Sequence, residues 1–259
     1  MALKIIVCFF AGMGAGLGTG FAGLSAAAVI SPMLISFLGI PAYQAVGIAL
    51  ASDVLASAVS AYTYGKNKNL DVKNGTVMMA FVLLFTAFGS YISSLVEAHA
   101  MGTMSTVMTM FLGVRFIVRP VMTTKEGMET ALTKKQRLIR SIIGGAMIGF
   151  ICGFVGAGGG MMMLLVLTSV LGYELKTAVG TSVFIMTFTA FTGSVSHFAI
   201  GKSVGDIAVL VLCVVFTFVF ARIAAKIANK ASAKTLNRIT GVILVVIGAV
   251  TVAFNLFSK

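Results

Sequence analysis

Charged residues are scarce in this sequence. Of its 259 residues, 10% are charged and 59% are hydrophobic, and the mean hydropathy is +1.07. A soluble domain is usually about 25% charged and about 45–50% apolar, so this chain cannot cover a water-facing surface. A soluble enzyme, a nucleic-acid-binding domain and a disordered protein are therefore excluded. The class that remains is a polytopic α-helical membrane protein, whose main partner is the lipid bilayer and which needs no nucleic acid.

Acidic residues, tryptophan and cysteine are few as well. Seven acidic residues oppose 19 basic ones, but the bases lie in short connectors between apolar runs, which is typical of positive-inside bias. Tryptophan is absent, so tyrosine and phenylalanine must supply any aromatic belt. Cys8, Cys152 and Cys213 lie inside apolar runs without metal-ligand spacing. They predict no disulfide framework, no metal site and no cofactor.

Ten apolar runs are separated by breaks, with a basic stretch at 121–140 between the fifth and the sixth. The runs cover residues 5–22, 24–38, 42–64, 74–96, 101–118, 142–155, 157–171, 176–200, 204–228 and 236–257. The first run could pass for a signal peptide. We assign it to the fold because a counterpart begins near residue 139.

The two halves of the chain repeat. A shift of 133 positions gives 12 identities over the 36 positions 12–47, without a gap. They include Gly20-Phe21-x-Gly23 against Gly153-Phe154-x-Gly156, and Ala45-Val46-Gly47 against Ala178-Val179-Gly180. We therefore predict a first repeat at 1–120, a basic cytoplasmic linker at 121–140 and a second repeat at 141–259.

The basic connectors predict the orientation of the repeats. One follows the third run of the first repeat, whereas another follows the fourth run of the second repeat. Because lysine and arginine favour the cytoplasmic side, equivalent connectors lie on opposite sides, which requires an inverted repeat. Both termini are then outside the cytoplasmic membrane.

The first two runs of each repeat hold only about 15–18 residues, and about 20 are needed to span the bilayer. The predicted fold is all-α and polytopic, with two inverted repeats. Each repeat has a Gly-rich broken or re-entrant helical hairpin and three transmembrane helices. Five full spans per repeat are the alternative, and they leave the topology unchanged.

The Gly-rich motifs resemble those of the sulfite exporter TauE/SafE family. They read Gly149-Phe150-Ile151-Cys152-Gly153-Phe154-Val155-Gly156-Ala157-Gly158-Gly159-Gly160, then Ala178-Val179-Gly180-Thr181-Ser182 and Ser196-His197, with Ser31-Pro32-Met33-Leu34 in the first repeat. The resemblance covers nearly the whole chain. It implies a transporter that exports, or sometimes takes up, sulfite or small organosulfonates such as sulfoacetate. The first repeat departs from the pattern with Leu24-Ser25-Ala26-Ala27, and Asp53 lies outside it.

The Gly-rich turns are the candidate substrate site. A helix that breaks inside a membrane leaves backbone N–H groups free at the start of its second half, and these groups attract anions. The candidate binding residues in the turns are Gly20, Phe21, Gly23, Ser25, Gly153, Gly156, Gly158 and Gly159. The alternative is that the glycines only allow helices to pack closely, which fits the spacing of Gly12, Gly16 and Gly20.

Hydroxyl and amide groups at the starts of the third and eighth runs form a second candidate set. Gln44, Thr177, Thr181 and Ser182 could donate hydrogen bonds to an oxyanion without adding fixed charge. Hydrogen bonding between helices is the alternative role of such side chains.

Two titratable residues are candidates for proton coupling. Asp53 lies about eleven residues from either end of its run, near the middle of the bilayer, where a carboxylate is costly. His197 lies near the outer end of its run. Each has a structural alternative as a hydrogen-bonded residue. Arg115, Arg119 and Arg222 could guide an anion to the pore or anchor helices at the cytoplasmic surface.

The sequence thus predicts a secondary transporter for a small oxyanion that works by alternating access, with proton coupling optional for export. A passive anion channel, or a cation or proton-coupled transporter that uses Asp53, is the alternative. An intramembrane enzyme is not indicated, because no nucleophile–base pair, metal cluster or phosphate-binding loop is present in the sequence. A homodimer is possible.

Overall fold

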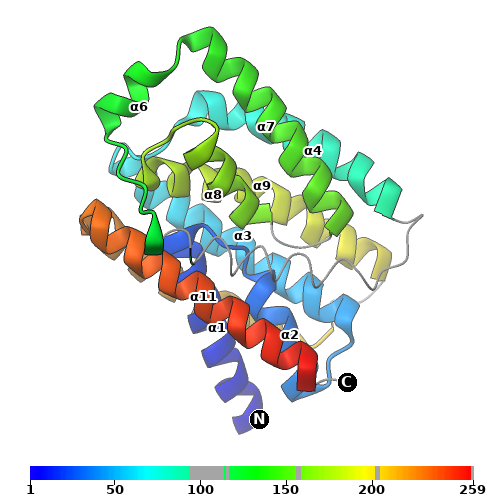
Figure 1. Ribbon diagram of the computed structural model, residues 1–259. Coiled ribbons are helices and arrows are strands. Elements are labelled where there is room, and N and C mark those ends of the chain that lie inside the picture. The colour runs from blue at the N-terminus through cyan, green and yellow to red at the C-terminus, as the bar shows by residue number, and fades with distance from the viewer. Residues whose placement is uncertain (94–113, 115–116, 156–158, 202–204, 258–259) are drawn as a thin grey trace.

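The computed structural model describes residues 1–93, 114, 117–155, 159–201 and 205–257 (Figure 1). These residues form helices and connecting turns, with no strand among them. The helices are α1 (Ala2–Ala22), α2 (Ala27–Leu38), α3 (Ala42–Lys66), α4 (Val72–Ser93), α6 (Lys125–Ala131), α7 (Lys134–Val155), α8 (Gly159–Ser169), α9 (Leu175–Gly201), α10 (Ile207–Lys230) and α11 (Ala233–Phe257). The predicted run at 101–118 lies almost wholly outside the described residues.

Four of the described helices are long and apolar enough to cross a membrane. They are α1, α3, α9 and α10. The prediction that both helices of a hairpin are too short is therefore wrong for α1, which has 21 residues, and holds for α2 with 12 and α8 with 11. α1 is longer because its helical backbone begins at Ala2, three residues before the first apolar run.

The helix α7 also begins earlier than predicted, at Lys134 and inside the basic stretch. Thr133 and Gln136 explain this start. The Oγ1 of Thr133 accepts a hydrogen bond from the Gln136 N–H at 3.3 Å, and the Oε1 of Gln136 accepts one from the Thr133 N–H at 3.1 Å. This reciprocal capping box starts a helix whatever the charge of the residues that follow, so α7 has 22 residues.

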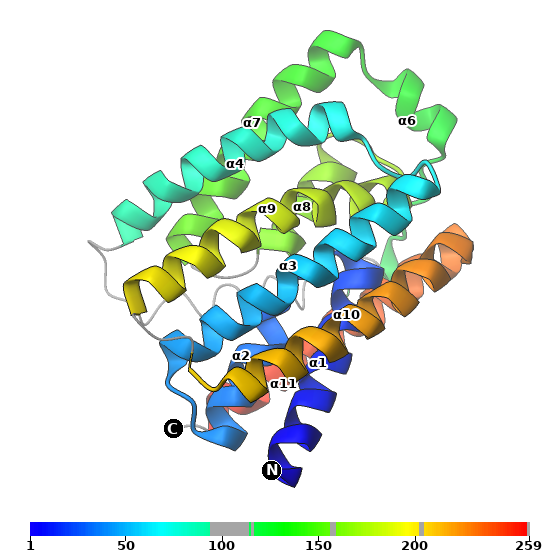
Figure 2. The ribbon, with the colours of Figure 1, turned by 180° about the vertical axis from the view of Figure 1, so that it is seen from behind.

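The helices form a bundle with two distinct ends (Figures 1 and 2). At one end, here called the terminal end, α1 begins, α2 ends, α10 begins and α11 ends. At the other, here called the basic end, α3 and α10 end and α4, α7, α9 and α11 begin. The bases in and beside these basic-end segments include Lys66, Lys68, Lys73, Lys125, Lys134, Lys135, Arg137, Arg140, Lys176, Lys230, Lys234 and Arg238.

Each hairpin returns to the end from which it enters. α2 turns back alongside α1 toward the terminal end (Figure 2). α8 returns toward the start of α7, where the Arg140 guanidinium donates a hydrogen bond to the Val170 carbonyl at 2.8 Å. The two hairpins therefore enter the bundle from opposite ends.

Glycines hold the first helix of each half against a helix of the other half. A Cβ on Gly16 of α1 would lie 2.6 Å from the carbonyl oxygen of Thr217 in α10. A Cβ on Gly145 of α7 would lie 2.7 Å from the carbonyl oxygen of Met78 in α4. No side chain fits at either place, so α1 packs directly on α10, and α7 on α4.

Candidate functional site

The break between α1 and α2 is a helix C-cap. Gly23 adopts a left-handed conformation with φ +62°, and its N–H donates to the Thr19 carbonyl at 2.9 Å. The Leu24 N–H donates to the Gly18 carbonyl at 3.2 Å, and the bond from Gly23 to Thr19 is the one that defines an αL C-cap motif. Glycine is needed here because a side chain disfavours positive φ. The motif fixes where α1 stops inside the protein.

Side chains from distant helices satisfy the last carbonyl groups of α1. The Tyr64 hydroxyl of α3 donates to the Gly20 carbonyl at 2.9 Å, and the Thr240 hydroxyl of α11 donates to the Phe21 carbonyl at 3.1 Å. A helix end away from water needs such donors. Gly20 and Phe21 therefore present acceptors at this break, and the Cα of Gly20 packs on Ala224 of α10.

A carboxylate already lies at the start of α2. The Ser25 hydroxyl donates to Asp53 Oδ2 at 2.8 Å, and the Ser57 hydroxyl donates to Asp53 Oδ1 at 2.9 Å. Asp53 is fully buried in the middle of α3. The N-cap residue of α2, Ala26, has no side-chain cap, and its backbone also hydrogen-bonds to the Asp53 carboxylate. The position that attracts anions by its helix dipole is thus occupied by the protein's own acid.

The second hairpin meets the first at this break. A Cβ on Gly160, the second residue of α8, would overlap the carbonyl oxygen of Gly23 and lie 2.8 Å from Sδ of Met186 in α9. A Cβ on Gly23 would overlap the hydroxyl of Ser182 in α9. We call Gly23, Ser25, Asp53, Gly160 and Ser182 the hairpin junction. It gathers residues from α3, α8, α9 and the α1–α2 turn.

The second predicted polar set is not gathered in one place. Ser182 reaches the junction, and its hydroxyl donates to the Val179 carbonyl at 2.8 Å. Thr181 accepts the Asp71 N–H at 3.2 Å, and Thr177 donates to the Glu174 carboxylate at 3.4 Å, so both contact loops at the basic end. Gln44 lies beside Gly205 next to the start of α10.

Several predicted residues are described in part or not at all. Gly156 and Gly158 lie outside the described residues. Gly153 falls in the last turn of α7, and Gly159 is the first residue of α8. His197 belongs to α9, but its side chain lies outside the described part of the chain. Sequence reasoning missed Ser57 and Met186, although Ser57 stands one turn from Asp53, a spacing that could have found it.

A polar cluster closes the basic end of the bundle. The Tyr173 hydroxyl donates to Asp71 Oδ2 at 2.6 Å, and the Arg137 guanidinium lies 5.9 Å from the centre of the Tyr173 ring. Burial raises the pKa of Tyr173, and its hydrogen bond to Asp71 adds to this. Asn69 donates to Asn229 at 2.7 Å. The cluster joins the α3–α4 loop to α7, the α8–α9 loop and α10.

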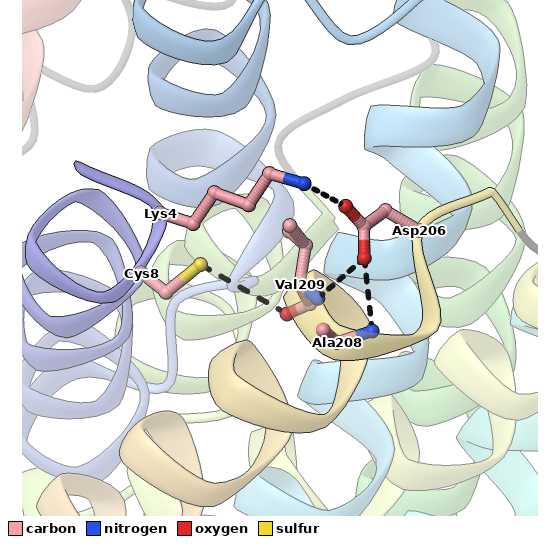
Figure 3. A network of polar contacts seen from close by, with 5 residues as sticks. All are labelled: Lys4, Cys8, Asp206, Ala208 and Val209. Atoms are coloured by element: carbon pink, nitrogen blue, oxygen red, sulfur yellow. Dashed lines mark hydrogen bonds and ion pairs between the residues drawn. The ribbon is translucent and has the colours of Figure 1, made fainter. Parts of the chain in front are cut away.

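One ion pair joins α1 and α10 at the terminal end (Figure 3). Lys4 Nζ lies 2.5 Å from Asp206 Oδ2, and the other carboxylate oxygen accepts the N–H groups of Ala208 and Val209 at 2.9 and 3.2 Å. Asp206 thereby caps α10. The hydrogen bond from Lys4, and then that from Val209, hold the pKa of Asp206 below its usual value.

Comparison with known proteins identifies the family of this chain. The family model described as sulfite exporter TauE/SafE matches residues 8–251. The chain belongs to the sulfite exporter TauE/SafE family. It is a membrane transporter, and nothing in the family match points to an enzyme.

Relatives of this TauE/SafE family chain come from a bacterium and an archaeon. It is 25% identical to the "probable membrane transporter protein YunE" of Bacillus subtilis over 99% of this chain and 100% of that protein. It is 25% identical to the "probable membrane transporter protein YdhB" of the same organism, over 77% of this chain and 79% of the relative. It is 27% identical to the "probable membrane transporter protein MJ0441" of Methanocaldococcus jannaschii, over 76% and 72%.

Proposed function

We propose that this TauE/SafE family protein is a secondary transporter that exports small sulfur oxyanions, either sulfite or organosulfonates such as sulfoacetate, across the cytoplasmic membrane. The anion binds at the hairpin junction and is exposed to the two sides in turn by alternating access. Neutral donors hold it there: the Ser25 and Ser182 hydroxyls and the first N–H groups of α2 and α8.

The contact between Gly160 and Gly23 is the observation that carries this proposal. It brings the start of α8 and the break before α2 to one place. Inverted-repeat transporters bind substrate at such broken helices near the bilayer midplane. Of the predicted binding residues that the structure describes, Gly23, Ser25, Ser182 and Gly159, which precedes Gly160, fit this site best. The contacts of the other predicted residues are better explained by helix packing and loop contacts; these residues are Gly20, Phe21, Gln44, Thr177 and Thr181.

The packing of the helices supports the inverted repeat. α1 packs on α10 as α7 packs on α4, which are equivalent pairs when residues 1–120 are exchanged with 141–259. Hairpins that enter from opposite ends fit the same symmetry. The concentration of lysine and arginine at the basic end favours a cytoplasmic position for that end, with both termini outside.

Alternating access would have to break different contacts at the two ends. The cluster of Asp71, Tyr173 and Asn229 ties the two halves together at the basic end, and Lys4–Asp206 does so at the terminal end. The inside-negative potential favours export of an anion by about 2.3 kcal/mol per charge per 100 mV. Export therefore needs no further energy source.

The two junction hydroxyls give the test. In proteoliposomes, Ser25→Ala and Ser182→Ala should each raise the KM for sulfite about two- to tenfold, the equivalent of one lost neutral hydrogen bond. Ser52→Ala is the matched control, because its buried hydroxyl donates to the Ile48 carbonyl in its own helix. An unchanged KM in both junction variants would contradict binding there. Flux that never saturates would instead indicate a passive anion channel.

The Asp53 carboxylate favours a second candidate, a transporter coupled to a cation or proton. A buried carboxylate that has no basic side chain as its partner can bind a cation instead. Wild-type flux of labelled sodium without any anion dependence would identify this function.

A further inference from the structure

One face of α3 carries a continuous row of polar residues. Asp53, Ser57, Ser60 and Tyr64 follow one another at steps of four, three and four, which places them on the same side of a helix. All four side chains are fully buried. Four buried polar side chains in a row on one helix face call for a role.

Both ends of this row are fixed to the first hairpin. Asp53 contacts the Ser25 hydroxyl, and Tyr64 contacts the Gly20 carbonyl. Ser60 lies between them, and its hydroxyl has no hydrogen-bond partner among the residues that the structure describes. An unpaired hydroxyl in a dry interior costs about 1–3 kcal/mol, so Ser60 is an unused donor and acceptor beside the hairpin.

No described cation balances the Asp53 charge. The helices packed against α3 are α1, α2, α9 and α10. α2 has no titratable residue. The titratable residues of α1, α9 and α10 are Lys4, Cys8, Lys176, His197, Cys213, Arg222, Lys226 and Lys230. The side chain of His197 is not described. Of the others, none hydrogen-bonds to the carboxylate or forms an ion pair with it, and Lys4 pairs with Asp206.

We propose that Asp53 takes up one proton when an anion enters the hairpin junction and gives it up when the anion leaves. This rests on the proposed function. The ionised carboxylate and an anion compete for Ser25 and the start of α2, and two negative charges there repel each other. The proton adds to one carboxylate oxygen, and no other bond is made or broken.

The polar row on α3 provides a hydrogen-bond acceptor for the protonated Asp53 carboxyl group. Once protonated, the Asp53 O–H turns to the Ser57 oxygen, and the Ser57 hydroxyl turns away toward the next acceptor along the row, Ser60. Hydroxyl groups make such reversals by rotation alone. The Ser25 hydroxyl is then released to the anion. The row continues to Tyr64 near the basic end, which gives the proton a polar route.

The direct test measures binding of methanesulfonate to the purified protein in detergent across a range of pH. Its single charge does not change with pH, whereas sulfite itself titrates. In the wild type, the Kd should rise about tenfold per pH unit once Asp53 is ionised, as one linked proton requires. Asp53→Asn, which cannot ionise, should bind at every pH as tightly as the wild type does at its acid limit. Ser60→Ala should shift the wild-type curve toward lower pH, and Ser52→Ala should not.

Two results with Asp53→Asn would contradict the linkage of proton uptake to anion binding. An Asp53→Asn protein that keeps the wild-type pH dependence, or that binds methanesulfonate at no pH, would overturn the proposal. If that variant does not fold, a pH-indicator dye in weakly buffered wild-type protein decides the matter. Uptake of up to one proton per bound anion is expected, and no uptake would overturn the proposal. Absence of sulfite flux in wild-type proteoliposomes would contradict the proposed function alone.

Discussion

The Cα of Gly160 faces the carbonyl oxygen of Gly23 so closely that no side chain fits between them. This contact joins the start of α8 to the end of α1, two segments that are 137 residues apart in the sequence. It places the start of α8 directly on the turn of the first hairpin. The proposed binding of substrate at the hairpin junction depends on this contact.

Gly160→Ala should push the two hairpins apart. Extra volume in a packed interior typically costs about 1–3 kcal/mol, and here the neighbour is backbone, which yields little. We expect a lower Tm in detergent and a reduced rate of sulfite flux. Gly14→Ala is a suitable control, because its Cβ would meet only the tip of the Val29 side chain, at 3.2 Å. Equal Tm values for the two variants would contradict the contact.

Tyr64→Phe should destabilise the end of α1. It leaves the buried Gly20 carbonyl without its donor, at a cost of about 1–3 kcal/mol. Tyr62→Phe provides the matched control, since Tyr62 is 72% exposed and lies in the same helix. Urea or thermal unfolding of the two variants makes the comparison. A loss of stability in Tyr62→Phe as large as in Tyr64→Phe would show that the hydrogen bond is not the cause.

The position of Gly16 gives a prediction about helix packing. In Gly16→Ala, the new methyl group would lie within 2.8 Å of the Ala221 nitrogen and 2.6 Å of the Thr217 carbonyl oxygen. We expect α1 to separate from α10, with a loss of about 1–3 kcal/mol and a lower Tm. A Tm that is unchanged, or that falls no further than in Gly14→Ala, would contradict direct packing of α1 on α10.

Asp206 should contribute to stability in a pH-dependent way. Its pKa in the folded protein is lowered by the hydrogen bond from Lys4 first and by the backbone of Val209 next. The stabilisation is therefore present above the ordinary aspartate pKa of about 3.9 and is lost as the pH falls through the lower folded value. Asp206→Asn should lower the Tm at neutral pH, and the difference from the wild type should narrow in acid. A Tm difference between the two proteins that grows as the pH falls would contradict this prediction.

The broad architecture could be read from the sequence, and the particular pairings could not. Low charge and long apolar runs predicted an all-α membrane protein, and most helix boundaries agree within a few residues. The predicted start of α7 was too late, because the basic residues at 121–140 indicated a linker and α7 begins among them. The Thr133–Gln136 pair was available as a capping box and gives the correct boundary.

The candidate site was predicted only in outline. The glycine spacing predicted where the helices break. It was equally compatible with close helix packing, which is the role that Gly12, Gly16 and Gly20 have against α10. The hydrogen bond from Ser25 to Asp53 spans 28 residues and depends on how α3 packs on the hairpin. A pattern along the chain carries no information on such a non-local contact. For the same reason, the sequence grouped Thr181 with Ser182 as a candidate donor to an oxyanion, whereas in the structure Thr181 contacts Asp71.

Counterflow of labelled sulfite in proteoliposomes tests the central claim most directly. Vesicles loaded with unlabelled sulfite should take up labelled sulfite transiently and saturably, with excess sulfoacetate as a competitor and chloride as a weak one. Transient accumulation blocked by sulfoacetate is the result that an alternating-access carrier for sulfur oxyanions predicts. If no labelled sulfite enters at any pH gradient or membrane potential, while the protein is folded in the vesicles, the proposed function is wrong.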